Sequence, residues 1–364
     1  MLGKIGNKLK KKFWKNKKVL VVGHTGFKGG WLTMILNLLG AKVYGIALNP
    51  ETKPNFFNLV NLKKYLIKDL RINIENYDRL NKEIKKIKPS IIFHLAAQSK
   101  VRDSYTSSLN TIKTNVLGTA NILEIFRNNS FINSLLITTT DKVYKNKNNK
   151  RSFTEIDELG GDDIYSASKS SIEIIANSYN ESFFNKSRKQ SIICLRAGNV
   201  IGGGDWTKDR IVKDCAESFI KNKPIKIRSP GASRPWQHVL EPLFGYLKLA
   251  EKLYTNKKFV GSWNFGPNFK NNLKVLDVAK FGIKVLKSKS KISFNKPKYY
   301  ESEHLSLDNK KSFKYLKWKT FLKPKDALKL AFDWYKFYYD NIDNKKLVVK
   351  FTFLQIKEYT KKFF

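Results

Sequence analysis

The sequence is poor in cysteine, methionine and histidine. Its 364 residues include two cysteines, two methionines and four histidines. Two cysteines, Cys194 and Cys215, exclude a disulfide-stabilised scaffold and fit a reducing compartment such as the cytoplasm. The four histidines lack the paired spacing of metal ligands, so we expect no metal site.

Long apolar runs are also missing. No run approaches the roughly 20 residues that a membrane-spanning helix needs, so we expect no membrane span. The basic N-terminus lacks the apolar centre of a signal peptide, which favours a cytoplasmic location. Seven Trp, 16 Tyr and 25 Phe, by contrast, predict a packed globular protein with a sizeable core.

Acidic residues are scarce relative to basic ones. The chain has 30 Asp and Glu against 70 Lys and Arg, a formal net charge of +40. Such a charge attracts phosphates, including those of nucleic acid. The excess is spread over the whole chain, so a solvated lysine-rich surface explains it and we expect no specific nucleic-acid partner. The clusters Lys8–Lys12 and Lys145–Arg151 stay candidates for contact with an anionic substrate.

The first two hundred residues alternate between short apolar runs and amphipathic segments. Strands are expected at Val19–Val22, Val43–Leu48, Ile91–Ala96, Leu135–Thr138 and Ile192–Leu195. Helices are expected around Trp31–Leu39, Tyr77–Ile87, Leu109–Phe126 and Ile172–Phe184. This alternation predicts a Rossmann-like, doubly wound α/β fold with a parallel sheet, whose ligands bind beyond the carboxyl ends of the strands.

A glycine-rich loop follows the first predicted strand. The strand up to Val22 leads into Gly23-His24-Thr25-Gly26-Phe27-Lys28-Gly29, and a helix follows. Glycines at this spacing let the backbone turn sharply and approach a pyrophosphate at the helix N-terminus. A plain tight turn is the alternative. We predict cofactor contacts at Gly23, Thr25, Gly26, Phe27, Lys28 and Gly29.

The rest of the cofactor pocket is predicted after the next strands. The candidates are Asn49 after the second strand, Asp69 and Leu70 near the adenine, and Leu95, Ala96, Ala97 and Gln98 after a later strand. No Asp or Glu stands directly at the end of the second strand, where such folds often bind the ribose diol of NAD. The residues therefore leave the choice between NAD and NADP open.

We predict a nucleotide-binding Rossmann domain over residues 13–200, which the segment 239–266 can rejoin. A smaller α/β substrate domain is predicted over 201–340, after the glycines at 202–204. Residues 1–12 and 341–364 are predicted basic terminal extensions. For residues 341–364 the sequence leaves three possibilities: a docked helix or strand, a contact with a partner, or a frayed end.

Two short motifs carry chemistry. Thr140 ends an apolar strand, and Tyr165 and Lys169 lie one helical turn apart, which is the apparatus for moving a hydride and its proton. Asp141 and Lys142 come directly after the threonine. A simple dehydrogenase does not need this pair, so the sequence suggests an acid and a base for a second reaction in the same site.

These motifs resemble those of the extended short-chain dehydrogenases/reductases, and within them the CDP-glucose 4,6-dehydratases, from about residue 13 to 338. The matching strings are Gly23–Gly29, Leu95–Gln98, Asn115, Thr140–Lys142, the Tyr165/Lys169 pair, Arg196–Trp206 and Arg234–Pro242. The resemblance implies NAD as cofactor, bound also by Asn115, and CDP-glucose as substrate. It further implies a 4-keto-6-deoxy sugar nucleotide as product and a homodimer formed through helices near 105–126 and 164–184.

The resemblance also assigns roles to the motif residues. Tyr165 takes the proton of the sugar's 4-hydroxyl, with Lys169 and the positive nicotinamide favouring its phenolate. Thr140 holds that oxygen, and Lys169 grips the nicotinamide ribose. Asp141 gives a proton to the departing 6-hydroxyl; a structural strand-end cap is the alternative.

Lys142 is assigned as the base that removes the C5 proton. Related dTDP- and GDP-sugar dehydratases have Glu at this place, and a lysine base needs a much lowered pKa. The alternative is an electrostatic stabiliser of the enolate or a ligand of the diphosphate.

Substrate contacts are expected mainly in the second half of the chain. They are Gln98, Asn199, Arg210, Arg234 and His238. Arg234 suits a diphosphate because a guanidinium donates two parallel hydrogen bonds. A surface role for Arg210 and a structural role for His238 are equally compatible with the sequence.

Three rival functions remain. A 4-epimerase of the same superfamily needs no acid/base pair for elimination, so Asp141 and Lys142 argue against it. A basic binding protein on a Rossmann fold predicts a broken active site, yet Thr140, Tyr165 and Lys169 are all present. A dehydratase for another nucleotide is the third, because the residues do not identify the base.

Overall fold

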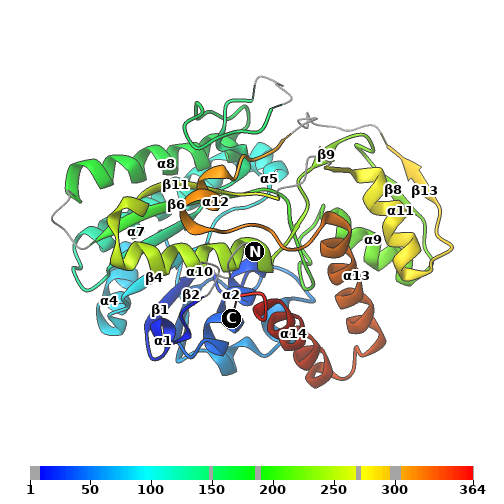
Figure 1. The fold of residues 1–364 in the computed structure, drawn as a ribbon, viewed down its shortest axis with the longest axis horizontal. Helices are drawn as coiled ribbons and strands as arrows, with labels where there is room; N and C mark the ends of the chain where they lie inside the picture. The colour runs from blue at the N-terminus through cyan, green and yellow to red at the C-terminus, as the bar shows by residue number, and fades with distance from the viewer. Residues whose placement is uncertain (1–8, 147–150, 185–189, 268–271, 296–304, 364) are drawn as a thin grey trace, which may run out of the picture.

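The computed structural model describes residues 9–146, 151–184, 190–267, 272–295 and 305–363. Residues 1–8 of the predicted N-terminal extension lie outside this part of the chain. Its centre is a parallel seven-stranded sheet in the order β11-β6-β5-β4-β1-β2-β3 (Figure 1). The strands are β1 (Lys18–Val22), β2 (Lys42–Ala47), β3 (Lys68–Arg71), β4 (Ile91–His94), β5 (Ser134–Thr138), β6 (Ser191–Ala197) and β11 (Gly261–Phe265).

Helices cover both faces of this sheet. Alternate residues of β1 point to opposite faces, so Val19 and Val21 join one core cluster while Leu20 and Val22 join the other. The first cluster is completed by α2 (Phe27–Leu38) and α10 (Leu240–Thr255). The second is completed by α4 (Tyr77–Ile87), α7 (Gly118–Arg127) and α8 (Ile164–Phe183). The predicted doubly wound α/β fold is confirmed.

Two elements of the sheet region differ from the expected pattern. The helix expected over 109–126 is divided into α6 (Ser108–Ile112), a π-helical turn η2 (Lys113–Leu117) and α7. Strand β3 was not predicted, because its four residues are half-buried or exposed and lack a strong apolar pattern. The remaining short helices here are α1 (Lys11–Trp14), α3 (Phe56–Leu59), η1 (Leu62–Tyr65), α5 (Val101–Thr106) and η3 (Asp141–Val143).

The second half of the chain builds a smaller part beside the sheet (Figure 1). Three two-stranded sheets lie in it: β7 (Val200–Ile201) with β10 (Gln237–His238), β8 (Ile225–Ile227) with β13 (Ile292–Phe294), and β9 (Ser233–Arg234) with β12 (Leu273–Lys274). Its helices are α9 (Ile211–Ile220), α11 (Val275–Leu286) and α13 (Pro324–Asp340). Helix α12 (Lys310–Leu316) packs against β11 of the main sheet (Figure 1), and the short η4 (Lys257–Phe259) precedes that strand. Strand β11 pairs in parallel with β6 and so returns to the main sheet.

The C-terminal segment forms a docked helix, α14 (Lys345–Thr360). Its buried face includes Val348, Ile356 and Tyr359. The Tyr359 hydroxyl donates a hydrogen bond of 2.5 Å to the buried carboxylate of Glu241 on α10. The two ends of the described chain also meet, because the Leu9 amide donates to the Phe363 carbonyl at 3.1 Å. Of the three readings of this extension, the docked helix is the one observed.

Among the described residues, no helix has the length and apolar character required to cross a bilayer.

Candidate active site

The glycine loop between β1 and α2 leaves no room for side chains. Gly23 has a φ of 95°, and a Cβ there would lie 2.5 Å from the amide nitrogen of Ala96. A Cβ on Gly29 would collide with the Gly23 carbonyl. The backbone can therefore approach a ligand closely at the N-terminus of α2, where helix amides favour a phosphate. A dinucleotide pyrophosphate fits this cradle.

A cleft of about 640 Å³ opens above the carboxyl ends of β1, β4 and β5. It contains most of the residues predicted for cofactor and catalysis: Gly23, Thr25, Gly26, Phe27, Lys28, Gly29, Asn49, Leu95, Ala96, Ala97, Gln98, Thr140, Asp141, Lys142, Tyr165 and Lys169. The order of the strands reverses between β1 and β4, the place where doubly wound sheets bind ligands. One cleft thus brings together the predicted cofactor and catalytic residues from Gly23 to Lys169, which are 146 positions apart along the chain.

The predicted adenine contacts Asp69 and Leu70 are not among the residues that line this cleft. The Asp69 carboxylate is instead bound by the ring of the buried His24, at 2.8 Å, and by the guanidinium of Arg71. Arg71 also donates through Nε to the Asn49 side chain at 3.0 Å. Residues just after β3 line the wall in their place, namely Ile72, Asn73 and Ile74.

Asn115 lies behind the cleft wall and does not line it. Its buried amide Oδ1 accepts from the Gln98 backbone N–H at 2.8 Å, and its Nδ2 donates to the Gln98 carbonyl at 3.1 Å and to Ser168 Oγ at 2.9 Å. It stands in the π-helical turn η2, a feature that often marks functional sites. In the structure Asn115 therefore fixes the backbone at Gln98 and ties it to α8.

Thr140, Asp141 and Lys142 follow the end of β5 and lie on the floor of the cleft. Thr140 is the N-cap of the short η3 turn, and its Oγ1 accepts from the Lys142 amide at 3.3 Å. Asp141 is buried, which raises the pKa of its carboxyl although Lys142 and Thr140 oppose the shift. Its Oδ2 has no hydrogen-bond partner among the described residues. A buried carboxyl with a raised pKa can hold and donate a proton.

Tyr165 and Lys169 come from the first turns of α8. Burial raises the pKa of Tyr165 to about 12, and a hydrogen bond with Thr140 opposes the rise. Burial also lowers the pKa of Lys169 to about 8. Desolvation outweighs the positive charge of Arg210, which opposes the rise in the pKa of Tyr165. The effect of Lys169 together with a bound nicotinamide stays a prediction.

Lys28 brings a further ammonium group into the cleft. Its pKa is lowered to about 8, first by burial and then by Arg210, while Asp141 and Asp205 oppose the shift. The sequence predicted Lys28 as a cofactor contact. It did not predict that the Lys28 ammonium lies close enough to Asp141 for their charges to interact. Sequence reasoning also missed the cleft residues Glu51, Asn110, Thr114 and Thr207, which stand in loops or on a helix without a distinctive motif, and gave no role to Asp205, although it lies in the matching string Arg196–Trp206.

A second cavity of about 240 Å³ adjoins the cleft. The two share Asn199, Val200, Asp205 and Arg210, so the predicted substrate contacts Asn199 and Arg210 stand at their junction. Arg234 is buried on β9 and lines the second cavity, where its charge acts on Asp141. Arg210 is half-exposed and pairs with Asp205 at 3.4 Å, and it lines both cavities.

His238 lies apart from the other predicted substrate contacts. It is fully buried on β10, meets the Trp31 ring edge-on, and lines neither cavity. Burial lowers its pKa to about 3, so the ring is neutral. This placement favours the structural role, one of the two roles that the sequence left open.

Within the described ranges, no three His, Cys, Asp or Glu side chains gather as metal ligands.

Comparison with known proteins places this geometry in a family. The model of the GDP-mannose 4,6 dehydratase family matches residues 20–329. This chain belongs to that family, within the extended short-chain dehydrogenases/reductases. It is 44% identical over 262 residues to the CDP-glucose 4,6-dehydratase of Salmonella typhimurium, covering 71% of this chain and 73% of the relative. The predicted resemblance is therefore confirmed.

Solved structures share the fold. The dTDP-glucose 4,6-dehydratase of Bacillus anthracis in complex with NAD gives a TM-score of 0.75 at 20% identity, covering 91% of this chain and 99% of that one. The UDP-glucose 4-epimerase of Thermotoga maritima with UDP-glucose gives 0.76 at 19% identity, covering 90% and 100%. These likenesses concern the backbone architecture, which dehydratases and epimerases have in common.

Proposed function

We propose that this protein is an NAD-dependent CDP-glucose 4,6-dehydratase. It converts CDP-glucose into CDP-4-keto-6-deoxyglucose and water. The observation that carries the proposal is the single cleft in which Thr140, Tyr165 and Lys169 meet the additional pair Asp141 and Lys142. The 44% identity to the Salmonella typhimurium CDP-glucose 4,6-dehydratase supports the choice of the nucleotide.

The glycine cradle and the N-terminus of α2 would hold the pyrophosphate of NAD, and Lys169 would hold the nicotinamide ribose. Bound there, NAD supplies the acceptor for two electrons taken from C4 and returns them at C6. Tyr165 accepts the proton of the 4-hydroxyl, whose oxygen Thr140 holds by a hydrogen bond. Because the pKa of Tyr165 is raised to about 12 in the protein alone, its action as a base depends on positive charge that the ligands bring into the cleft.

The 4-ketone acidifies the C5 hydrogen, which allows water to leave across C5 and C6. Lys142 takes the C5 proton. Asp141 gives its proton to the departing 6-hydroxyl, and its buried, unpartnered Oδ2 supports this assignment. As the two electrons return to C6, Lys142, whose proton has exchanged with solvent, would return a proton to C5, so the sugar loses one water in total.

The second cavity would receive the nucleotide part of the substrate. Arg234 and Arg210 offer guanidinium groups for the diphosphate, and they lie between the catalytic cleft and the far wall at β8. Asn199 stands at the junction and would contact the sugar or the diphosphate.

We infer that the protein is a homodimer. Large apolar side chains are exposed on the helices α5, α6 and α8 and on the turn η2. They are Tyr105, Leu109, Ile112, Leu117, Ile164 and Ile174. A second copy pairing through these helices would cover them. We place the enzyme in the cytoplasm, where the unpaired Cys194 and Cys215 stay reduced.

The experiment is mass spectrometry of the products from purified protein, NAD⁺ and CDP-, dTDP-, UDP- or GDP-hexose in deuterated water. Loss of one water from CDP-glucose, with deuterium at C5, is expected. Conversion to a galactose isomer of unchanged mass would identify an epimerase instead. Absence of turnover with every substrate, while NAD⁺ binds, would refute the catalytic assignments.

A further inference from the structure

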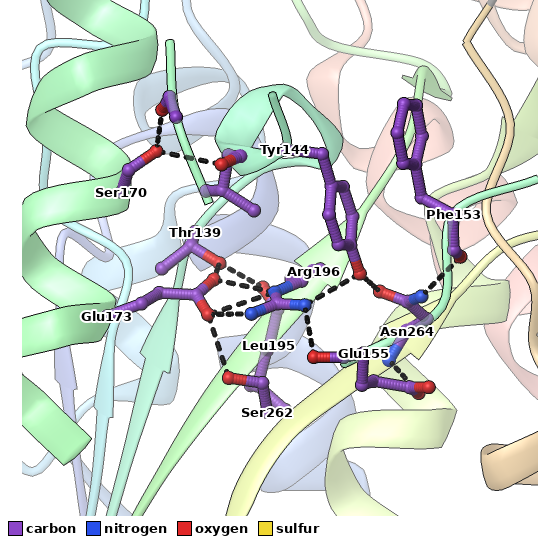
Figure 2. A network of polar contacts seen from close by, with 12 residues as sticks. Thr139, Tyr144, Phe153, Glu155, Ser170, Glu173, Leu195, Arg196, Ser262 and Asn264 are labelled. Carbon is purple, nitrogen blue, oxygen red and sulfur yellow. Dashed lines mark hydrogen bonds and ion pairs between the residues drawn. The ribbon is translucent and has the colours of Figure 1, made fainter. Parts of the chain in front are cut away.

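A buried polar network joins the end of β5 to α8, β6 and β11 (Figure 2). Its centre is the ion pair between Glu173 on α8 and Arg196 on β6, whose side chains are 0% and 2% exposed. Arg196 Nε lies 2.9 Å from each carboxylate oxygen of Glu173. The guanidinium also donates through Nη1 to the Tyr144 hydroxyl at 2.6 Å.

Two hydroxyls complete the hydrogen bonding of the Glu173 carboxylate. Thr139 donates to Oε1 at 2.6 Å, and Ser262 on β11 donates to Oε2 at 2.7 Å. Tyr144 in turn donates to the Asn264 side chain at 2.7 Å. The network therefore joins the end of β5 to α8, β6 and β11 through buried groups that are fully partnered, as such groups must be to avoid a large desolvation cost.

Several members of the network stand next to a residue of the proposed chemistry. Thr139 precedes Thr140 and Asp141, and Glu173 lies one helical turn after Lys169. Arg196 precedes Ala197, which lines the cleft. Glu173, Arg196 and Tyr144 themselves do not line it, so they reach the reaction only through these neighbours.

We propose that the Glu173–Arg196 pair is a positioning unit that holds the elimination acid Asp141 at a fixed place relative to Tyr165 and Lys169. The hydrogen bond from Thr139 to Glu173 is the link that transmits this position, because it couples the strand end carrying Asp141 to the helix carrying Lys169. The inference rests on the proposed function, and it assigns Glu173 and Arg196 a role in catalysis without contact to the substrate, transmitted through Thr139, which itself lines the cleft.

The network offers a matched pair of substitutions. Thr139→Val removes one hydrogen bond to the Glu173 carboxylate at the catalytic side and keeps the branched shape. Ser262→Ala removes one hydrogen bond to the same carboxylate from β11, away from the acid. If the network only stabilises the fold, both changes act alike. If it positions Asp141, only Thr139→Val slows elimination.

The expected result for Thr139→Val is a fall in kcat of about 10- to 100-fold, with KM nearly unchanged. Absorbance of the reduced cofactor should then rise during turnover, because oxidation at C4 continues while elimination lags. Thr139→Ser should restore kcat, and Ser262→Ala should keep it. Thr139→Ala repeats the test if the valine variant does not fold. Equal losses of kcat in Thr139→Val and Ser262→Ala would overturn the inference.

A second measurement needs no substrate. Hydrogen–deuterium exchange of peptides covering residues 134–146 should become faster in Thr139→Val and stay at the wild-type rate in Ser262→Ala. Failure of the wild type to convert CDP-glucose refutes the proposed function, whereas unchanged exchange in Thr139→Val refutes the positioning role. The two failures are therefore distinguishable.

Discussion

The ammonium group of Lys169 donates a hydrogen bond of 3.1 Å to the backbone carbonyl of Thr138, the last residue of β5. This contact ties α8 to the strand whose end carries Thr140 and Asp141. Together with the Thr139–Glu173 contact one residue later, it gives the strand end two anchors on the same helix. The residues proposed for oxidation, Tyr165 and Lys169, and the elimination acid Asp141 are thus held by the same contacts between α8 and the end of β5.

Replacing Tyr165 with Phe should abolish oxidation at C4. The phenol oxygen is the group that receives the 4-hydroxyl proton, and loss of such a group costs roughly 10² to 10⁴ in rate. Absorbance of the reduced cofactor should not appear when CDP-glucose is added. Binding of NAD⁺, followed by calorimetry, should persist because the glycine cradle is untouched. Wild-type turnover in this variant would contradict the assignment.

Replacing Asp141 with Asn should separate the two half-reactions. The amide cannot donate the acidic proton that the departing 6-hydroxyl needs, so we expect elimination to fall by roughly 10² to 10⁴. Oxidation should continue, and reduced cofactor should accumulate after CDP-glucose is added. The measurement is the absorbance of the reduced cofactor, which should rise in Asp141→Asn and stay absent in Tyr165→Phe. If Asp141→Asn shows no accumulation, Asp141 acts before elimination.

Lys142 is tested by replacing it with Arg and with Met. Arg keeps the positive charge but does not lose a proton in proteins, so it cannot act as a base. We expect both variants to lose deuterium incorporation at C5, measured by mass spectrometry in deuterated water. Activity retained by Lys142→Arg and lost by Lys142→Met would instead assign Lys142 to electrostatic stabilisation or to the diphosphate.

Glu241 predicts a pH dependence of stability. Burial raises its pKa to about 7, and its carboxylate accepts from Tyr359 and from the Phe321 and Leu322 amides. The folded state keeps a proton that the unfolded state releases above its pKa of about 4.3, so the free energy of unfolding should fall by about 3 kcal/mol between pH 4.3 and 7.

Urea unfolding at pH 5 and at pH 7.5 measures this fall. Glu241→Gln should flatten the dependence across that interval, because the amide does not titrate. Glu358→Gln is the control, since Glu358 is exposed on α14 and pairs with the exposed Lys361. An unchanged dependence in Glu241→Gln would exclude Glu241 as its source.

Leu109→Asp should dissociate the proposed dimer. Leu109 is 63% exposed on α6, and a carboxylate there is costly only if a second copy covers it. Size-exclusion chromatography with light scattering should give the mass of a monomer. Ile156→Asp is the control, because Ile156 is 95% exposed in a turn outside these helices. A wild-type monomer would refute the dimer itself.

The sequence predicted those parts of the fold and site that follow from local patterns. Continuous apolar runs identified β1, β4, β5 and β6, and the glycine loop identified the start of α2. The pairs Asp141–Lys142 and Tyr165–Lys169 were recognised because each lies within one short segment. The structure then placed both pairs in the same cleft.

What the sequence did not predict depends on tertiary packing. His238 stands in a string shared with the family, yet only the fold shows that the ring points into the core against Trp31. The engagement of Asp69 by His24 and Arg71 arises from neighbouring strands and has no sequence signature. The raised pKa of Tyr165 likewise results from burial, which a linear sequence does not report.

Strand β11 has a consequence for how the polypeptide is made. It fills the edge of the sheet beside β6, but more than sixty residues, including part of the smaller region and helix α10, separate the two along the chain. During synthesis, β6 therefore emerges with an open edge, a known template for wrong pairing, until residue 265 has left the ribosome. A fragment that stops near residue 200 would keep that edge open and is expected to aggregate, which sets a lower limit on any truncation used for expression.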